Sequence, residues 1–239
     1  MQFLSLLLNS ASGTDYTEMS MNFMGDFWNM IVQLAEGFGV SISIFFLTLL
    51  FALPLALPIA LGRMSKIKVV SKLIEWLLLI VRGTPLMLQL IFVYFAPYYL
   101  FDIPLSGYRF PATIIAFSIN YACYFAEIYR SGLQAIPIGQ HEAASVLGYK
   151  KSQTFFRIVL PQVIKHILPP MSNEVITLIK DTALAQTLAV VELFRVANTM
   201  ASSQASLLPI IIAGVFYLIG SFIITRFFNF AERKLNYYR

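Results

Sequence analysis

Long apolar runs constrain this chain more than any other feature. The segment Phe38–Leu61 contains 24 residues without a charge, and Leu207–Ile224 is also uncharged. An apolar run of about 18 residues or more is long enough to cross a bilayer as an α-helix. Backbone polar groups in lipid must be satisfied within the structure, and the chain shows no period-two alternation over ten-residue strands. We therefore expect membrane-spanning helices rather than a β-barrel.

Three further segments are apolar but carry a few charges: Lys72–Leu100, Pro111–Tyr129 and Pro169–Val190. With the two uncharged runs they predict an all-α integral membrane protein with five transmembrane helices. The helices form one membrane domain over residues 38–239, after an extracytoplasmic segment over residues 1–37. Within that first segment, the stretch Phe3–Leu8 has no preceding Lys or Arg and no long apolar core. It predicts a loose or interfacial tail rather than a signal peptide.

The composition excludes several classes of protein. The chain is 58% hydrophobic with a mean hydropathy of +0.74. Only 12% of its residues are charged, against about 25% in soluble domains. This excludes a soluble enzyme domain, a disordered chain and a nucleic-acid-binding module. Because the chain has a single Cys and two His, we expect no disulfide framework, no metal site and no cofactor.

The placement of the basic residues predicts the orientation in the membrane. Of the 17 Lys and Arg residues, 13 fall in the first and third connections and the tail, and two fall in the other connections. The remaining two, Arg82 and Lys180, lie inside spans. Basic residues accumulate on the cytoplasmic side, so we expect the N-terminus outside and the C-terminus in the cytoplasm. The net charge of +5 then reflects orientation and contact with membrane lipid.

The connection over about 131–168 is too long for a simple loop and is expected to carry function or structure of its own. A short helix is predicted to begin at Gln140 or His141 and to end at Gly148, since Gly commonly follows a helix end. A second short helix is predicted over Ser152–Val163, with Ser152 as its N-cap. The two helices would form a knob on the cytoplasmic face.

This connection carries a motif with specific spacing. Glu142-Ala143-Ala144 is followed by three residues, Gly148, nine residues and Ile158-Val159-Leu160-Pro161. The arrangement resembles, at every position, the EAA signature of permease subunits of ABC importers with the type I fold. The resemblance implies a coupling helix, which docks in a cleft of an ATP-binding subunit. It also implies that Glu142, Ala143, Ala144 and Gly148 couple the permease to ATP hydrolysis.

Three further stretches are similar to those of permeases for polar amino acids: Arg82–Leu90, Tyr124–Gly132 and Lys180–Leu184. The combined resemblance covers about Ser41 to Lys234. It implies an importer subunit in the cytoplasmic membrane of a prokaryote. The implied partners are two ATP-binding subunits, an extracytoplasmic amino-acid-binding protein and a second permease, either identical or homologous. The chain has no G-x-x-x-x-G-K-[ST] sequence, so we expect ATP hydrolysis in a partner chain and no catalytic residue here.

Ionisable residues inside spans are costly and are therefore candidates for a substrate pathway. Glu174 and Asp181 are seven residues apart and share a helix face. Lys180 borders this face, so the group suits a zwitterion. Alternatively, these charges pair with each other or with Arg82 to hold the helices together. Asn120 lies on a polar stripe that is either a helix–helix seam or part of the pathway. We expect Glu174, Asn120 and Arg82 to line the translocation path, with Asp181 and Lys180 as further candidates.

Other classes of function remain as alternatives. A membrane enzyme would need a catalytic constellation, and the scattered carboxylates, the lone Cys and the two His form no triad in the sequence. A secondary transporter usually has more spans or inverted repeats and would leave the EAA spacing unexplained. A closer alternative is an ABC permease for another solute, such as an opine, a sulfur amino acid or an osmolyte.

Overall fold

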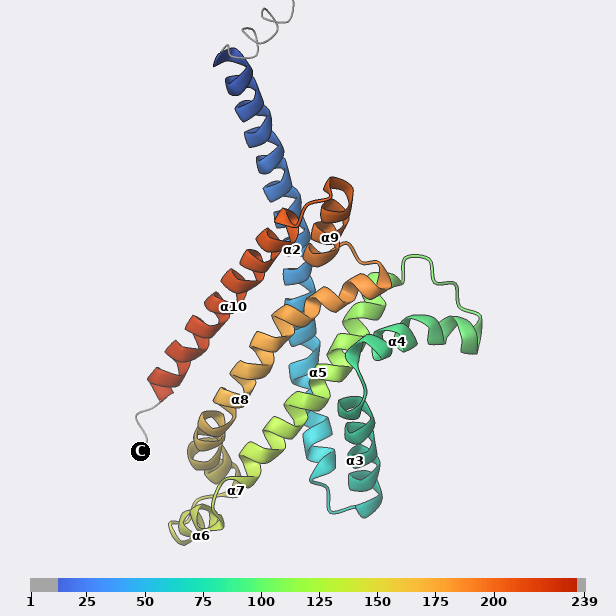
Figure 1. The fold of residues 1–239 in the computed structure, drawn as a ribbon. Helices are drawn as coiled ribbons and strands as arrows, with labels where there is room; N and C mark the ends of the chain where they lie inside the picture. Colours follow the sequence, from blue (N-terminus) through green and yellow to red (C-terminus); the bar gives the residue numbers. More distant parts are fainter. Residues whose placement is uncertain (1–12, 236–239) are drawn as a thin grey trace, which may run out of the picture.

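The computed structural model describes residues 13–235, with side chains from residue 25 onward, and the prediction for Phe3–Leu8 lies outside these residues. Figure 1 shows the described chain as a set of helices packed around one central helix. The elements are α2 (Gly13–Arg63), α3 (Lys68–Gly83), α4 (Leu86–Phe101), α5 (Arg109–Gln134), α6 (Ile138–Val146), α7 (Lys151–Thr154), η1 (Phe155–Val159), α8 (Leu160–Asp181), η2 (Thr182–Leu188), α9 (Leu193–Gln204) and α10 (Leu208–Leu235).

Helix α2 is the longest element and contains the predicted span Phe38–Leu61. It has 51 residues, which corresponds to about 75 Å at 1.5 Å per residue. It passes position 37 without a break, and its N-terminal end projects beyond α9 (Figure 1). Pro54 and Pro58 lie inside this helix.

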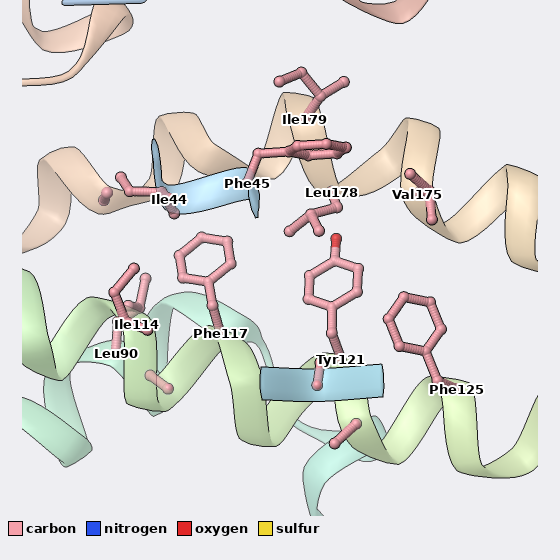
Figure 2. Close-up of a cluster of buried hydrophobic side chains, with 14 of the residues drawn as sticks. Ile44, Phe45, Leu90, Ile114, Phe117, Tyr121, Phe125, Val175, Leu178 and Ile179 are labelled. Atoms are coloured by element: carbon pink, nitrogen blue, oxygen red, sulfur yellow. The ribbon is translucent and has the colours of Figure 1, made fainter. Parts of the chain in front are cut away.

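Helix α5 forms the centre of the bundle. Phe117, Tyr121 and Phe125 recur every four residues and are at most 2% exposed. They pack against residues from α2, α4 and α8 in one continuous core (Figure 2). On α2, Ala52, Ala56 and Ala60 are also spaced by four and at most 1% exposed. Small side chains at this spacing allow two membrane helices to approach closely, which explains the extensive packing between α2 and α5.

Two helices among the described residues are long and apolar enough to cross a membrane by themselves: Gly25–Arg63 and Leu208–Leu235. The pair α3 and α4 forms a third candidate, but the two helices are bent by 110°. The predicted spans over 111–129 and 169–190 fall on α5 and α8. These helices have 26 and 22 residues and are long enough to cross, but they are less apolar because much of their surface faces protein rather than lipid.

The predicted second span over 72–100 is not one straight helix. It breaks at Gly83-Thr84-Pro85, between the end of α3 and the start of α4. Thr84 is extended, with φ −118° and ψ 147°, because a proline disfavours helical conformation in the residue before it. The Gln89 side-chain amide stabilises the break by donating to the carbonyl oxygens of Val81 at 2.7 Å and Thr84 at 3.1 Å.

The prediction of a separate short helix over Ser152–Val163 is wrong. The chain is helical from Lys151 through α7, η1 and α8 to Asp181, and the N-cap residue is Lys150 rather than Ser152. The five residues of η1 form a wider π-type turn that ends two residues before Pro161. A proline clashes with the carbonyl four residues earlier in a regular α-helix, and the wider turn removes this clash. The membrane helix therefore begins earlier than residue 169, and the predicted knob keeps only its first helix, α6.

Candidate functional site

The short helix predicted around the EAA triplet is present as α6, which begins at Ile138, two residues before the predicted start at Gln140, and protrudes at one end of the bundle (Figure 1). Within the EAA triplet, Ala144 is 1% exposed, whereas Glu142 and Ala143 face outward. Three large apolar side chains near them are strongly exposed: Ile138 at 75%, Val146 at 88% and Leu147 at 73%. Exposed apolar groups concentrated on so short a segment are typical of a protein–protein docking surface.

Gly148 ends α6 in a Schellman motif. The Tyr149 N–H donates to the carbonyl of Ala144, and the Gly148 N–H donates to that of Ser145, both at 3.0 Å. This pattern requires a left-handed residue directly after the helix, and Gly148 has φ +77°. Glycine adopts this conformation without the steric cost that a side chain adds. The left-handed conformation that ends α6 therefore explains why the EAA spacing has a glycine at this position.

The start and end of this connection are fixed to each other. Ile136, two residues before α6, packs against Val159 at the end of η1 and Val163 in the first turn of α8, and all three are at most 7% exposed. Gly132 lies in the last two turns of α5, where an added Cβ would overlap the Ile167 side chain. The close contact between α5 and α8 therefore depends on a glycine here, and it determines where α6 is placed.

Asp181 is held by a residue far away in sequence. The Tyr121 hydroxyl on α5 donates to the Asp181 carboxylate at 2.8 Å, and Tyr121 is 2% exposed. Lys180, the preceding residue on α8, is exposed and acts on Asp181 through its charge. The sequence did not single out Tyr121 as a functional residue, although it is adjacent to the candidate Asn120.

Glu174 and Arg82 lie near this group. The charges of Arg82 and Asp181 both act on the Glu174 carboxylate, which is half-buried. Arg82 forms an ion pair with Glu127 at 3.8 Å and lies over the Tyr124 ring, 5.3 Å from its centroid. The structure thus brings the predicted candidates Glu174, Asp181 and Arg82 into one electrostatic neighbourhood between α3, α5 and α8.

Asn120 is oriented toward a different partner. Its side-chain amide donates to the Gln89 oxygen at 3.0 Å, and Asn120 is 5% exposed. Gln89 in turn holds the break between α3 and α4 through the bonds described above. Asn120 therefore fixes the broken segment onto α5, and Gln89, which the sequence presented only as part of a motif, is the residue that joins them.

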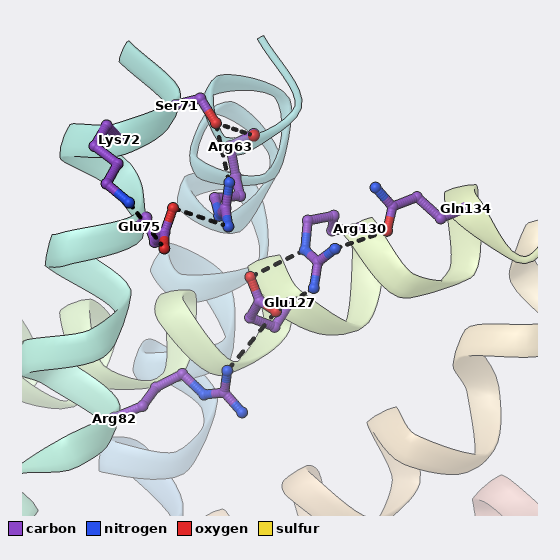
Figure 3. Close-up of polar contacts among 8 residues, drawn as sticks. All are labelled: Arg63, Ser71, Lys72, Glu75, Arg82, Glu127, Arg130 and Gln134. Atoms are coloured by element: carbon purple, nitrogen blue, oxygen red, sulfur yellow. Dashed lines mark hydrogen bonds and ion pairs between the residues drawn. The ribbon is translucent and has the colours of Figure 1, made fainter. Parts of the chain in front are cut away.

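Two groups of ion pairs connect α2 with α3 and α3 with α5 (Figure 3). Glu75 accepts from Arg63 at 3.2 Å and from Lys72 at 3.5 Å. Glu75 and Arg82 share a helix face by spacing but pair with different residues. Glu127, the partner of Arg82, also binds Arg130 at 2.7 Å.

The opposite end of the bundle has its own buried charge. Glu192 is fully buried and caps α9 by accepting from the N–H groups of Phe194 and Arg195, both at 2.8 Å. The Tyr217 hydroxyl on α10 donates to it at 3.1 Å, and Ser41 on α2 donates at 3.4 Å. One carboxylate therefore connects α2, α9 and α10. Within the described part of the chain, no group of three or more His, Cys, Asp or Glu residues is placed to hold a metal ion.

The geometry is that of a helical membrane component with a protruding docking helix, and comparison with known families agrees. Residues 52–237 match the family described as binding-protein-dependent transport system inner membrane component. The chain belongs to this family of ABC transporter permeases, whose members are the non-catalytic membrane subunits of their transport systems.

Relatives among characterised permeases align over most of the chain. The L-cystine transport system permease protein TcyB of Bacillus subtilis (strain 168) is 37% identical over 218 residues, which cover 88% of this chain and 92% of TcyB. The nopaline transport system permease protein NocM of Agrobacterium fabrum is 36% identical, and the alignment covers 85% of this chain and 88% of NocM. The arginine transport system permease protein ArtQ of Bacillus subtilis is 33% identical, and the alignment covers 84% of this chain and 92% of ArtQ.

Solved structures confirm the predicted fold class. A chain from the crystal structure of an amino acid ABC transporter with histidines has a TM-score of 0.77 and 30% identity, covering 87% of this chain and 97% of that one. The inward-facing MetNI methionine ABC transporter has a TM-score of 0.63 at 17% identity, covering 89% and 98%, and its similarity concerns the fold alone. The all-helical type I permease fold predicted from the sequence is therefore correct.

Proposed function

We propose that this chain is the translocation subunit of an importer that carries polar amino acids into the cell. The observation that carries the proposal is the intact coupling segment: α6 exposes an apolar docking surface, and Gly148 ends it in the conformation that only glycine adopts freely. The relatives TcyB and ArtQ, named for cystine and arginine transport, support an amino acid as the substrate.

The neighbourhood of Glu174 supports a zwitterionic substrate. Carboxylates on α8 offer acceptors for an ammonium group, and Arg82 and Lys180 offer cations for a carboxylate. The Tyr121 hydroxyl holds the Asp181 carboxylate in one orientation, which supports a role for Asp181 in shaping the path. Among the described residues, the Glu174 side chain makes no hydrogen bond or ion pair, and the Arg82 side chain is 43% exposed. We assign Glu174 and Arg82 as substrate contacts, with Asp181, Lys180 and Asn120 shaping the path around them.

The assembly that fits this role has two ATP-binding subunits under the coupling helices of two permease chains, identical or homologous. An amino-acid-binding protein delivers the solute from outside. The N-terminus lies outside and the C-terminus in the cytoplasm of a prokaryotic cell membrane, with residues 1–37 forming an extracytoplasmic segment ahead of the permease domain. ATP binding shifts the balance between inward- and outward-open states because the closed ATP-binding dimer binds one of them better.

Two substitutions test the proposal. Replacing Glu174 by Gln should change transport rate or substrate preference, whereas Glu36→Gln, the same change at an exposed position on α2, should leave both unchanged. Replacing Glu142 by Ala should abolish the stimulation of ATPase activity by loaded binding protein in an assembled complex. Unchanged uptake by the Glu174 variant would refute the pathway assignment, and unchanged stimulation in the Glu142 variant would refute the coupling role.

A second candidate substrate class is favoured by one observation. NocM, named for nopaline transport, is almost as similar to this chain as TcyB is, and the octopine permease OccM of Rhizobium radiobacter is 32% identical. An opine importer would use the same coupling helix and differ in the groups that line the path. Competition of amino acids and opines for uptake distinguishes the two.

A further inference from the structure

A cavity lies between α8 and α10, away from the path proposed above. Its volume is about 400 Å³, and it is lined by Lys165, Leu168, Pro169, Asn229, Glu232, Arg233 and Leu235. Sites for small ligands typically have volumes of about 300–1,000 Å³. The cavity is therefore large enough for a small polar group, and neither the coupling motif nor the charged residues near Glu174 contribute to it.

The two walls of the cavity are matched helix faces. On α8 the lining residues are 165, 168 and 169, and on α10 they are 229, 232 and 233. Both sets have the spacing i, i+3, i+4, which places their members on one face of a helix. The two helices lie side by side and pack against each other (Figure 1). The polar groups of α10 therefore face α8 across the cavity.

The charges in the cavity favour a group with both signs. Lys165 and Arg233 are cations, and arginine and lysine bind phosphate through charge-assisted hydrogen bonds. Glu232 is half-buried beside them and accepts hydrogen bonds only, as ionised carboxylates do. Asn229 adds a carbonyl oxygen and an amide. The combination suits a ligand that carries a phosphate and a primary ammonium a few atoms apart.

The surroundings indicate that this ligand is a lipid. On α10, Phe227 and Phe230 are 65% and 67% exposed, and on α8 Ile164 is 38% exposed. The Arg226 guanidinium lies over the Phe222 ring, 5.0 Å from its centroid, an arrangement that suits a cation at the boundary between acyl chains and headgroups. The cavity begins about one helical turn beyond Arg226, toward the basic end of α10. It thus lies at headgroup depth, with exposed apolar surface on the side of the acyl chains.

We propose that the cavity between α8 and α10 binds the headgroup of a zwitterionic aminophospholipid, phosphatidylethanolamine being the simplest. Its phosphate lies against Lys165 and Arg233, and its ammonium group lies against Glu232. The proposal goes beyond the transport function and does not depend on the solute that is carried. A lipid held there connects α8, which carries the candidate substrate residues, to α10.

Native mass spectrometry of the full-length chain tests the proposal. The purified protein is stripped of lipid and supplied with phosphatidylethanolamine, phosphatidylcholine or phosphatidylglycerol. We expect one phosphatidylethanolamine to be retained in preference to the other two, because choline has no N–H to donate and glycerol has no positive charge. This comparison uses the unaltered protein and so does not depend on the folding of any variant.

Variants then locate the bound lipid. The double substitution Lys165→Gln and Arg233→Gln should weaken retention about tenfold, which corresponds to about 1.4 kcal/mol. Lys234→Gln, at the neighbouring position outside the cavity, should have no effect. Glu232→Gln should remove the preference over phosphatidylglycerol.

Three results would overturn the proposal. The first is equal retention of phosphatidylcholine, and the second is equal loss in the Lys234 variant and the double variant. The third is displacement of the lipid by an equal concentration of soluble glycerophosphoethanolamine. That result would mean that the cavity takes a free headgroup rather than a membrane lipid.

Discussion

Replacing Glu192 by Ala should destabilise the packing of α9 against α2 and α10. The substitution removes the acceptor for the Phe194 and Arg195 N–H groups, and loss of an N-cap costs about 0.5–2 kcal/mol. It also removes the hydrogen bond donated by the part-buried Tyr217 hydroxyl, and one such bond is worth about 0.5–1.5 kcal/mol net. The expected loss of stability is therefore about 1–3.5 kcal/mol.

The assay is thermal unfolding of the purified protein in detergent, measured as the fraction of protein that remains monodisperse after heating. Glu192→Gln keeps one acceptor oxygen and should lose less stability than Glu192→Ala, and Tyr217→Phe should lose about 1 kcal/mol, the typical net worth of one hydrogen bond. Glu36→Ala, on the exposed side of α2, serves as the matched control and should change stability by less than about 0.5 kcal/mol. The reasoning is refuted if the Glu192→Ala protein unfolds at the same temperature as the Glu36→Ala protein.

Three further substitutions test the placement of the coupling helix and the broken span. Gly132→Ala should destabilise the protein by about 1–3 kcal/mol through overlap with Ile167, and adding Ile167→Ala should restore part of the loss in thermal unfolding; a double variant less stable than either single variant would contradict this. Gly148→Ala places a residue with a side chain at φ +77°, which costs about 1–2 kcal/mol, and it should reduce ATPase stimulation. Gly139→Ala is the control and should leave the stimulation unchanged, because the added Cβ meets open space. Gln89→Ala frees the α3–α4 break and should increase amide hydrogen exchange at residues 81–88; unchanged exchange would show that Gln89 does not hold it.

The features that depend on local pattern were predictable from the sequence. The uncharged runs predicted the membrane parts of α2 and α10, and the EAA spacing with its glycine predicted α6 and its end. The start of α8 was predicted wrongly because Ser152 resembles a helix N-cap and Pro161 resembles a helix boundary. The π-type turn of η1 accommodates Pro161, and the periodicity of the sequence does not predict such a turn.

The features that depend on distant contacts could not be predicted. Asp181 is bonded to Tyr121, 60 residues earlier, and Ser41 is bonded to Glu192, 151 residues later. Helical spacing shows which residues share a face, but it does not show which face of another helix lies opposite. Glu75 and Arg82 share a face of α3 by spacing, but Glu75 pairs with Arg63 of α2 and with Lys72 of its own helix, and Arg82 pairs with Glu127 of α5.

The central claim is that this chain moves amino acids when a separate ATPase works through its coupling helix. The most direct test measures ATP hydrolysis by the chain assembled with an ATP-binding subunit in nanodiscs, with binding protein and each of the twenty amino acids in turn. The account predicts stimulation by one chemical group of amino acids, and loss of that stimulation in the Glu142→Ala complex. A constant rate in a stably assembled complex, together with solute uptake by the chain in the absence of any ATPase, would contradict it.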